Sequence, residues 1–260
     1  MMVNDKISTD TTMGRRLTTH EISHTYMPFY MGTNEARYGF MDEGWATSFD
    51  YLLARYYYGA SNAETVYKAR RVKSWIKDPS AEQDLPIITP GTALNGRAIR
   101  SNSYVKASLG YLAMLDMLGE GLFKKCLHEY MHRWNGKHPI PWDFFNTFNA
   151  ASGKNLDWFW NNWFFSNNYI DLAISKPVKT RAGYLLTVNN IGGMAAPFDI
   201  VITYADNSIY SFYKTAEVWK ENSKQFKAEI RTTKLIRSIE ISRSIFMNAD
   251  ESNNIWKTHE

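Results

Sequence analysis

The stretch His20-Glu21-Ile22-Ser23-His24, followed by Glu43, carries the strongest indication of fold and chemistry in this chain. In a helix, residues four apart lie on one face, so both histidines can direct a ring nitrogen at the same ion. Glu21 is rotated off that line, where it can act as a base without ligating the metal. A zinc hydrolase needs three protein ligands, an open position for water and a base beside it. The eighteen residues between His24 and Glu43 allow one helix to end and a second to begin.

The same five-residue pattern occurs again at His128-Glu129-Tyr130-Met131-His132, and His138 follows six residues later. With Asn135 where many metzincins carry glycine, this run imitates a three-histidine zinc signature. Such matches are hypotheses until their context supports them. A metzincin-like zinc site at His128, His132 and His138 is therefore the alternative to a site at the first copy.

The sequence around the first copy resembles the M1 family of zinc metallopeptidases, to which aminopeptidase N and leukotriene A4 hydrolase belong. The resemblance includes the interval to Glu43 and its Asp42-Glu43-Gly44 context. It continues at Ser103-Tyr104-Val105-Lys106-Ala107, which is similar to the family's Tyr-x-Lys-Gly/Ala segment. Residues 138–145 and 156–164 resemble the helices that close the family's catalytic domain. In this alignment, the second copy lies on a helix without a metal role.

The resemblance implies a zinc-dependent peptidase that acts on peptide substrates, and it assigns metal-binding or catalytic roles to five residues. One zinc ion would be held by His20, His24 and Glu43. Glu21 would be the general base that later passes its proton to the leaving amine. Tyr104 would donate a hydrogen bond to the oxyanion as it forms. For Asp42, we prefer capping of the following helix to contact with a zinc ligand.

Composition supports a folded protein and narrows its partners. The chain has 260 residues, of which 22% are charged and 44% hydrophobic, as in globular proteins. The net charge is +4, and the basic residues are scattered in short pairs such as Arg15-Arg16 and Arg70-Arg71, so nucleic-acid binding is not supported. No apolar run reaches the length of a membrane span. The single cysteine, Cys126, excludes an internal disulfide, and the compartment stays undetermined.

The hydrophobic pattern predicts an α+β, multi-domain chain. Residues 1–176 should form a mainly α-helical, thermolysin-like catalytic subdomain, and residues 177–260 a small β-sandwich. Residues 1–12 should be frayed, and residues 78–102 should form an irregular segment at the rim of the active-site cleft. Helices are predicted at about 14–26, 42–59, 61–75, 104–118, 121–134, 141–151 and 155–165. Strands are predicted at 184–188, 198–204, 209–213, 225–230 and 235–241, with a hairpin turn at 205–208.

The chain also departs from the M1 pattern. In relatives, an N-terminal β-domain and a mixed sheet precede the zinc helix and carry a Gly-x-Met-Glu-Asn motif, whose glutamate binds the free amino terminus of the substrate. This sequence has no such motif. We therefore expect a C-terminal part of an M1 enzyme, with the N-terminal M1 domains as a potential partner. Aminopeptidase activity is the leading expectation, and a non-catalytic, zinc-stabilised interaction module is the alternative.

Overall fold

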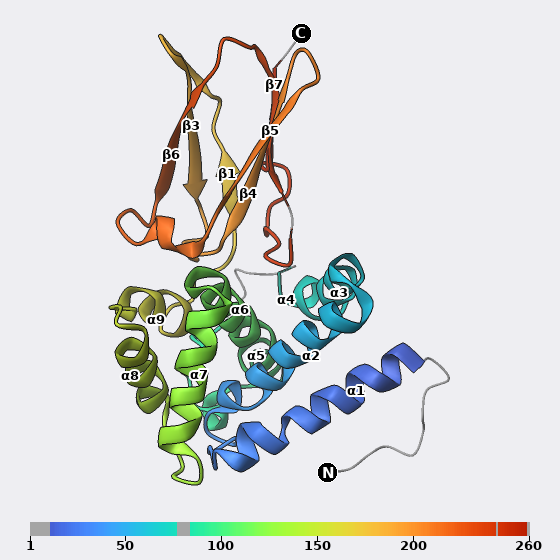
Figure 1. Cartoon of the computed structure of the whole chain (residues 1–260), viewed down its shortest axis with the longest axis vertical. Helices are drawn as coiled ribbons and strands as arrows, with labels where there is room; N and C mark the ends of the chain where they lie inside the picture. Colours follow the sequence, from blue (N-terminus) through green and yellow to red (C-terminus); the bar gives the residue numbers. More distant parts are fainter. Residues whose placement is uncertain (1–10, 77–83, 243, 259–260) are drawn as a thin grey trace. The chain divides into compact units, whose positions relative to one another are not determined.

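The computed structural model describes residues 11–76, 84–242 and 244–258. They divide into two compact units (Figure 1). The helical unit comprises the described residues up to Trp75 and those from 84 to Asn167, and the β unit comprises Ile76 and the described residues from Asn168 on. This organisation agrees with the predicted α+β class. The exact domain bounds given above, 1–176 and 177–260, stay predictions, and the expectation for residues 1–10 lies outside the described residues.

The helical unit follows the apolar pattern of the sequence closely. Glycines with positive φ, Gly59 and Gly119, end two of its helices, because this backbone conformation costs a glycine little. Pro141 begins another at the position where a proline is tolerated. The α-helices are α1 (Thr11–Ser23), α2 (Glu43–Tyr58), α3 (Ala60–Tyr67), α4 (Lys73–Ile76), α5 (Gly96–Ile99), α6 (Ala107–Leu118), α7 (Glu120–Trp134), α8 (Pro141–Ser152) and α9 (Asp157–Phe164).

Two predicted boundaries were wrong near the site. Helix α1 ends at Ser23 rather than Tyr26, and a π-turn follows at Thr25–Tyr30. Met27 in that turn has φ −126° and ψ 104°, because a residue before proline is pushed out of the helical region. The segment predicted to be irregular up to residue 102 is partly helical, since α5 and a π-helix at Arg100–Lys106 lead directly into α6. Its residues 77–83 lie outside the described chain.

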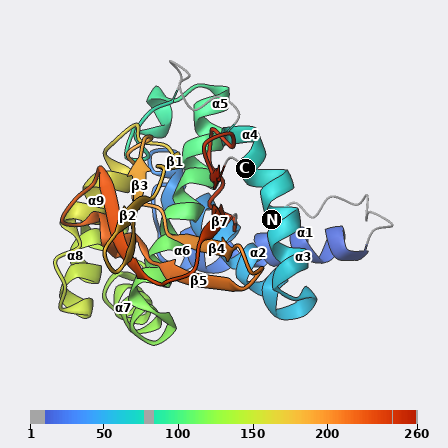
Figure 2. The same ribbon diagram turned by 90° about the horizontal axis from the view of Figure 1, so that it is seen from above.

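An aromatic core fixes the start of α2. Trp45 stacks on Tyr111 of α6 with ring centroids 4.0 Å apart, and Phe144 of α8 meets both rings edge-on. Gly44 lets the helices approach closely, because a Cβ at this position would lie 2.7 Å from the Cβ of Ala107. Helix α1 lies along α2 in both views (Figures 1 and 2). The core thereby holds Glu43, the first residue of α2, beside α1.

The β unit is a sandwich of two antiparallel sheets. In one sheet β3 pairs with β1 and β2 on one side and with β6 on the other; the second sheet has the order β5-β4-β7-β8. Phe226 of the first sheet contacts Phe198 and Phe212 of the second. The strands are β1 (Leu172–Ile174), β2 (Val178–Thr180), β3 (Gly183–Asn190), β4 (Phe198–Tyr204), β5 (Ile209–Lys214), β6 (Gln225–Arg231), β7 (Ile236–Ser242) and β8 (Ile255–Lys257).

The predicted sandwich and the hairpin turn between β4 and β5 are confirmed. Strand β4 shows the reason, because its residues alternate between buried and half-buried along the whole strand. The sequence pattern missed β1, β2 and β8, each of three residues, since so short a strand shows too little alternation to be recognised.

Candidate metal centre

Two neighbouring helices bring the predicted ligands together. His20 lies near the end of α1, His24 directly follows it, and Glu43 begins α2. Ligand atoms of the three side chains all lie within 4.8 Å of one another. The Nε2 atoms of His20 and His24 are 3.1 Å and 3.5 Å from Glu43 Oε2. The spacing read from the sequence therefore corresponds to a real cluster of side chains.

The donor set fits a zinc ion. Zinc is bound by imidazole nitrogen and carboxylate oxygen at about 2.0–2.2 Å, so two ligands at tetrahedral angles lie about 3.3 Å apart. The two nitrogen–oxygen distances of 3.1 Å and 3.5 Å lie on either side of this value. Three ligands also leave a position for water or substrate, as in catalytic rather than structural zinc sites.

Asp42 orients His24, and this corrects the capping role predicted above. The Asp42 side chain makes no capping hydrogen bond to α2. Its Oδ1 instead accepts a hydrogen bond from His24 Nδ1 at 2.6 Å, and the Met27 carbonyl lies 3.1 Å from the same nitrogen. Because both partners are acceptors, Nδ1 carries the proton and Nε2 is left as the ligand atom. The Asp42 hydrogen bond raises the pKa of His24 to about 9, so a metal competes with a proton there.

Tyr104 contacts the Glu43 carboxylate oxygen that the two histidines leave free. Its hydroxyl donates to Glu43 Oε1 at 2.5 Å, and its ring stacks on His20 with centroids 6.4 Å apart. Burial opposes ionisation of Glu43, but the hydrogen bonds from His20 and Tyr104 outweigh it and hold the carboxyl pKa below its usual value. Burial, with the adjacent carboxylate, raises the pKa of Tyr104. The phenol is therefore a hydrogen-bond donor beside a charged ligand.

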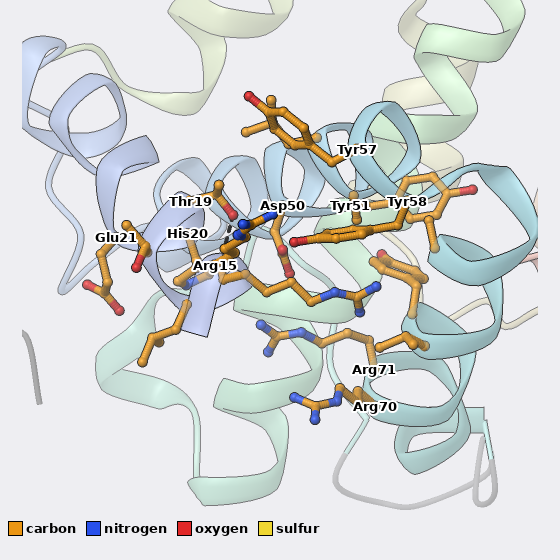
Figure 3. A pocket seen from close by; sticks show the side chains of 18 of the residues that line it. Arg15, Thr19, His20, Glu21, Asp50, Tyr51, Tyr57, Tyr58, Arg70 and Arg71 are labelled. Carbon is orange, nitrogen blue, oxygen red and sulfur yellow. Dashed lines mark hydrogen bonds between the residues drawn. The ribbon is translucent and has the colours of Figure 1, made fainter. Parts of the chain in front are cut away.

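A cavity of about 1220 Å³ opens onto the cluster. Glu21, one residue after His20, is half-buried and lines it, as Tyr104 does. Figure 3 shows His20 and Glu21 on α1, and Asp50 and Tyr51 further along the same cavity. The candidate base, the ligands and Tyr104 thus share one space that is large enough for a segment of peptide.

The second pentapeptide forms no such cluster. In the part of the chain that the structure describes, His, Cys, Asp and Glu side chains gather at metal-ligand distances in one place, the His20, His24 and Glu43 cluster. His128 and His132 are exposed on α7, and His138 Nδ1 donates to the Gly32 carbonyl at 2.7 Å. The metzincin-like alternative is therefore wrong.

Sequence reasoning missed further residues around the cavity. Two arginine pairs, Arg15-Arg16 and Arg70-Arg71, line it although they are far apart in the chain. His20 Nδ1 and Asp50 Oδ1 are buried without a hydrogen-bond partner in the described structure. No sequence pattern indicated that the arginine pairs, His20 and Asp50 line one cavity, because this depends on how α1, α2 and the π-helix after α3 pack.

A His-Glu-x-x-His segment whose two histidines cluster with a third glutamate is the pattern of metallopeptidases. Residues 1–163, more than half of the sequence, match the model of the peptidase family M1 domain. The chain belongs to the peptidase family M1. Searching curated proteins by sequence gave no match.

A solved structure also resembles this fold. The chain superposes on aminopeptidase A of Legionella pneumophila, crystallised with aspartic acid, with a TM-score of 0.63 and 16% sequence identity. The superposition covers 91% of this chain and 26% of that protein. The likeness confirms the fold, and this chain spans about a quarter of the length of the larger protein. Within the described residues, no helix is long and apolar enough to cross a membrane.

Proposed function

We propose that this chain carries the catalytic metal centre of a zinc-dependent M1 peptidase that hydrolyses peptide bonds, as an aminopeptidase. The observation that supports it is the convergence of His20, His24 and Glu43 to within 4.8 Å at the mouth of a cavity lined by Glu21 and Tyr104. When bound, zinc would polarise the scissile carbonyl and lower the pKa of water at the site.

The chain's own residues supply the proton transfers and the positioning. Glu21 accepts a proton from the attacking water on its carboxylate and delivers it to the nitrogen of the leaving amine. Tyr104 donates its hydroxyl hydrogen bond to the carbonyl oxygen while negative charge builds there. Asp42 keeps His24 in the tautomer and orientation that present Nε2 to the ion.

The exopeptidase part of the proposal rests on family membership. Selection of a free amino terminus requires an acceptor for an ammonium group, and we assign that role to no residue of this chain. The N-terminal domains that M1 relatives carry would supply it, as a partner of this unit.

The test is zinc-dependent hydrolysis. The chain is stripped with a chelator, zinc is added back, and bound metal is counted while hydrolysis of an aminoacyl anilide is followed beside its N-acetylated counterpart. We expect one zinc per chain and hydrolysis that returns with the metal. A chain that binds no zinc at stoichiometric supply would reject the proposal. Full zinc occupancy without hydrolysis of either substrate would favour the zinc-stabilised interaction module instead.

A further inference from the structure

The cavity continues beyond the metal cluster into a strongly basic region. Arg15 and Arg16 reach it from α1, and Arg70 and Arg71 from the π-turn that follows α3. Figure 3 shows the Arg70 and Arg71 side chains extended in the same direction in the cavity. Among the described residues that line the cavity, only Asp50 adds a carboxylate to those of Glu21 and Glu43. The four guanidinium groups are called the arginine cluster here, and among the described lining residues they share the cavity with one carboxylate outside the metal site, that of Asp50.

The Asp50 carboxylate does not use all of its hydrogen-bonding capacity. Its Oδ1 is buried without a hydrogen-bond partner among the described residues. Burial raises the pKa of Asp50, although the charges of Arg71, Arg16 and Arg70 oppose this shift. Arg16 Nε is likewise buried without an acceptor, while another nitrogen of its guanidinium donates to Asn62 Oδ1. A buried charged donor without an acceptor is costly, so the cavity favours an anionic occupant.

The arginine cluster lies close to the reacting atoms. The Arg71 guanidinium carbon is 5.5 Å from the centroid of the Tyr104 ring, and the Tyr104 hydroxyl contacts Glu43. One aromatic ring therefore separates Arg71 from a metal ligand. An extended peptide advances about 3.3–3.6 Å per residue. A substrate group on the residue next to the scissile bond, or on the residue after it, can therefore reach the Arg71 guanidinium.

We propose that the arginine cluster binds a carboxylate of the peptide substrate close to the scissile bond, so that this chain prefers acidic or very short peptides. The inference deepens the proposed peptidase function and rests on it. Guanidinium groups are suited to this role, because their planar N–H donors match the two oxygens of a carboxylate. The carboxylate comes either from an Asp or Glu side chain or from the free C-terminus of a short peptide.

Matched peptides separate these two sources. Ala-Ala-Ala with a free C-terminus is compared with its amide, and Ala-Glu-Ala amide with Ala-Gln-Ala amide. We expect kcat/KM to be about tenfold or more higher for the acidic member of at least one pair, because a charge-assisted hydrogen bond commonly contributes that factor. The pair that shows the difference identifies the source. Equal values within both pairs would overturn the proposal.

Variants locate the effect in the arginine cluster. In Arg70→Gln and Arg71→Gln, the ratio between acidic and neutral peptides should fall towards one, and in Arg70→Glu it should invert in favour of Ala-Lys-Ala amide. The control is Arg181→Gln, which removes an exposed charge in the β unit and should keep the wild-type ratio. A ratio that survives in all three cavity variants would contradict the proposal. Inversion is diagnostic, since a misfolded cavity would lose the preference without reversing it.

If the chain hydrolyses no peptide, peptide binding still tests whether the arginine cluster recognises a carboxylate. The metal-free protein is titrated with Ala-Ala-Ala, Ala-Glu-Ala amide and Ala-Gln-Ala amide by calorimetry. Tighter binding of an acidic peptide that weakens with added salt and in Arg71→Gln supports the arginine cluster, even if the peptidase proposal fails. Equal affinity for the three peptides, or no binding of any, would reject the inference.

Discussion

The two His-Glu-x-x-His segments of this chain share a sequence pattern but differ in the exposure and the contacts of their side chains. At the end of α1, the side chains of His20 and His24 are 10% and 13% exposed and contact Glu43, whereas His128 and His132 are exposed on α7. Glu21 lines a cavity, but the matching Glu129 accepts a hydrogen bond from Arg133 at 2.5 Å on the helix surface. The pentapeptide sets the spacing of two ligands. The third ligand and the carboxylate that orients a histidine come from a second segment.

The buried faces of the two helices explain the difference. Helix α7 turns Phe123, Cys126, Leu127 and Tyr130 into the core, so its histidines lie on the solvent side. Helix α1 buries His20 against α2 instead. An identical pattern thus yields a metal cluster or a solvated helix face, depending on which side of the helix packs.

The largest difference between the two segments should appear in catalysis. We expect Glu21→Gln to lower kcat by about 10²–10⁴-fold with zinc retained, because general-base catalysis typically contributes that factor. The matched change Glu129→Gln should leave the rate unchanged. Steady-state kinetics with metal analysis checks both. Equal loss in the two variants would show that the segments are not functionally distinct.

Two tyrosines, one at the metal cluster and one within the second segment, provide the next contrast. Tyr104→Phe removes the proposed oxyanion donor and should cost about 10²–10³-fold in kcat, as loss of one such donor does elsewhere. Tyr130→Phe is the control, since its buried hydroxyl has no partner within the described residues and lies in the core of α7. It should keep full activity. Retention of activity in Tyr104→Phe would remove this residue from the mechanism.

A smaller effect should come from the acid that orients His24. Asp42→Asn keeps the size of the side chain but weakens the hydrogen bond, and about 10–100-fold weaker zinc binding is expected. Competition with a chelator of known affinity measures it. The control Glu35→Gln alters an exposed acid nearby and should bind zinc like the wild type. If Asp42→Asn also binds as tightly, Asp42 has no role in holding the ligand.

The smallest effects are expected in the free energy of unfolding, when one glycine of α2 and one of α7 are replaced. Gly44→Ala should destabilise the fold by about 1–3 kcal/mol, because its Cβ would lie 2.7 Å from that of Ala107. Gly121→Ala in α7 meets nothing within 4 Å and should stabilise by about 0.5–1 kcal/mol. Denaturant unfolding monitored by circular dichroism compares them. Stabilisation by Gly44→Ala would contradict the close approach of α2 to α6.

The sequence predicted the elements whose pattern is long and the site whose ligands are spaced along two helices. Strand β4 and helix α7 were placed within a residue, because each shows a continuous periodicity. The role of Asp42 was missed, since a residue before a helix most often caps it, and only the position of His24 shows otherwise. The arginine cluster appeared in the sequence as two unrelated pairs. Tertiary packing alone gives them a common cavity.

Zinc stoichiometry in paired alanine variants tests the central claim most directly. The chain, His24→Ala and His132→Ala are loaded with zinc, dialysed and analysed for bound metal. The account predicts about one zinc per chain in the wild type and in His132→Ala, and almost none in His24→Ala. Loss of zinc in His132→Ala with retention in His24→Ala would contradict it.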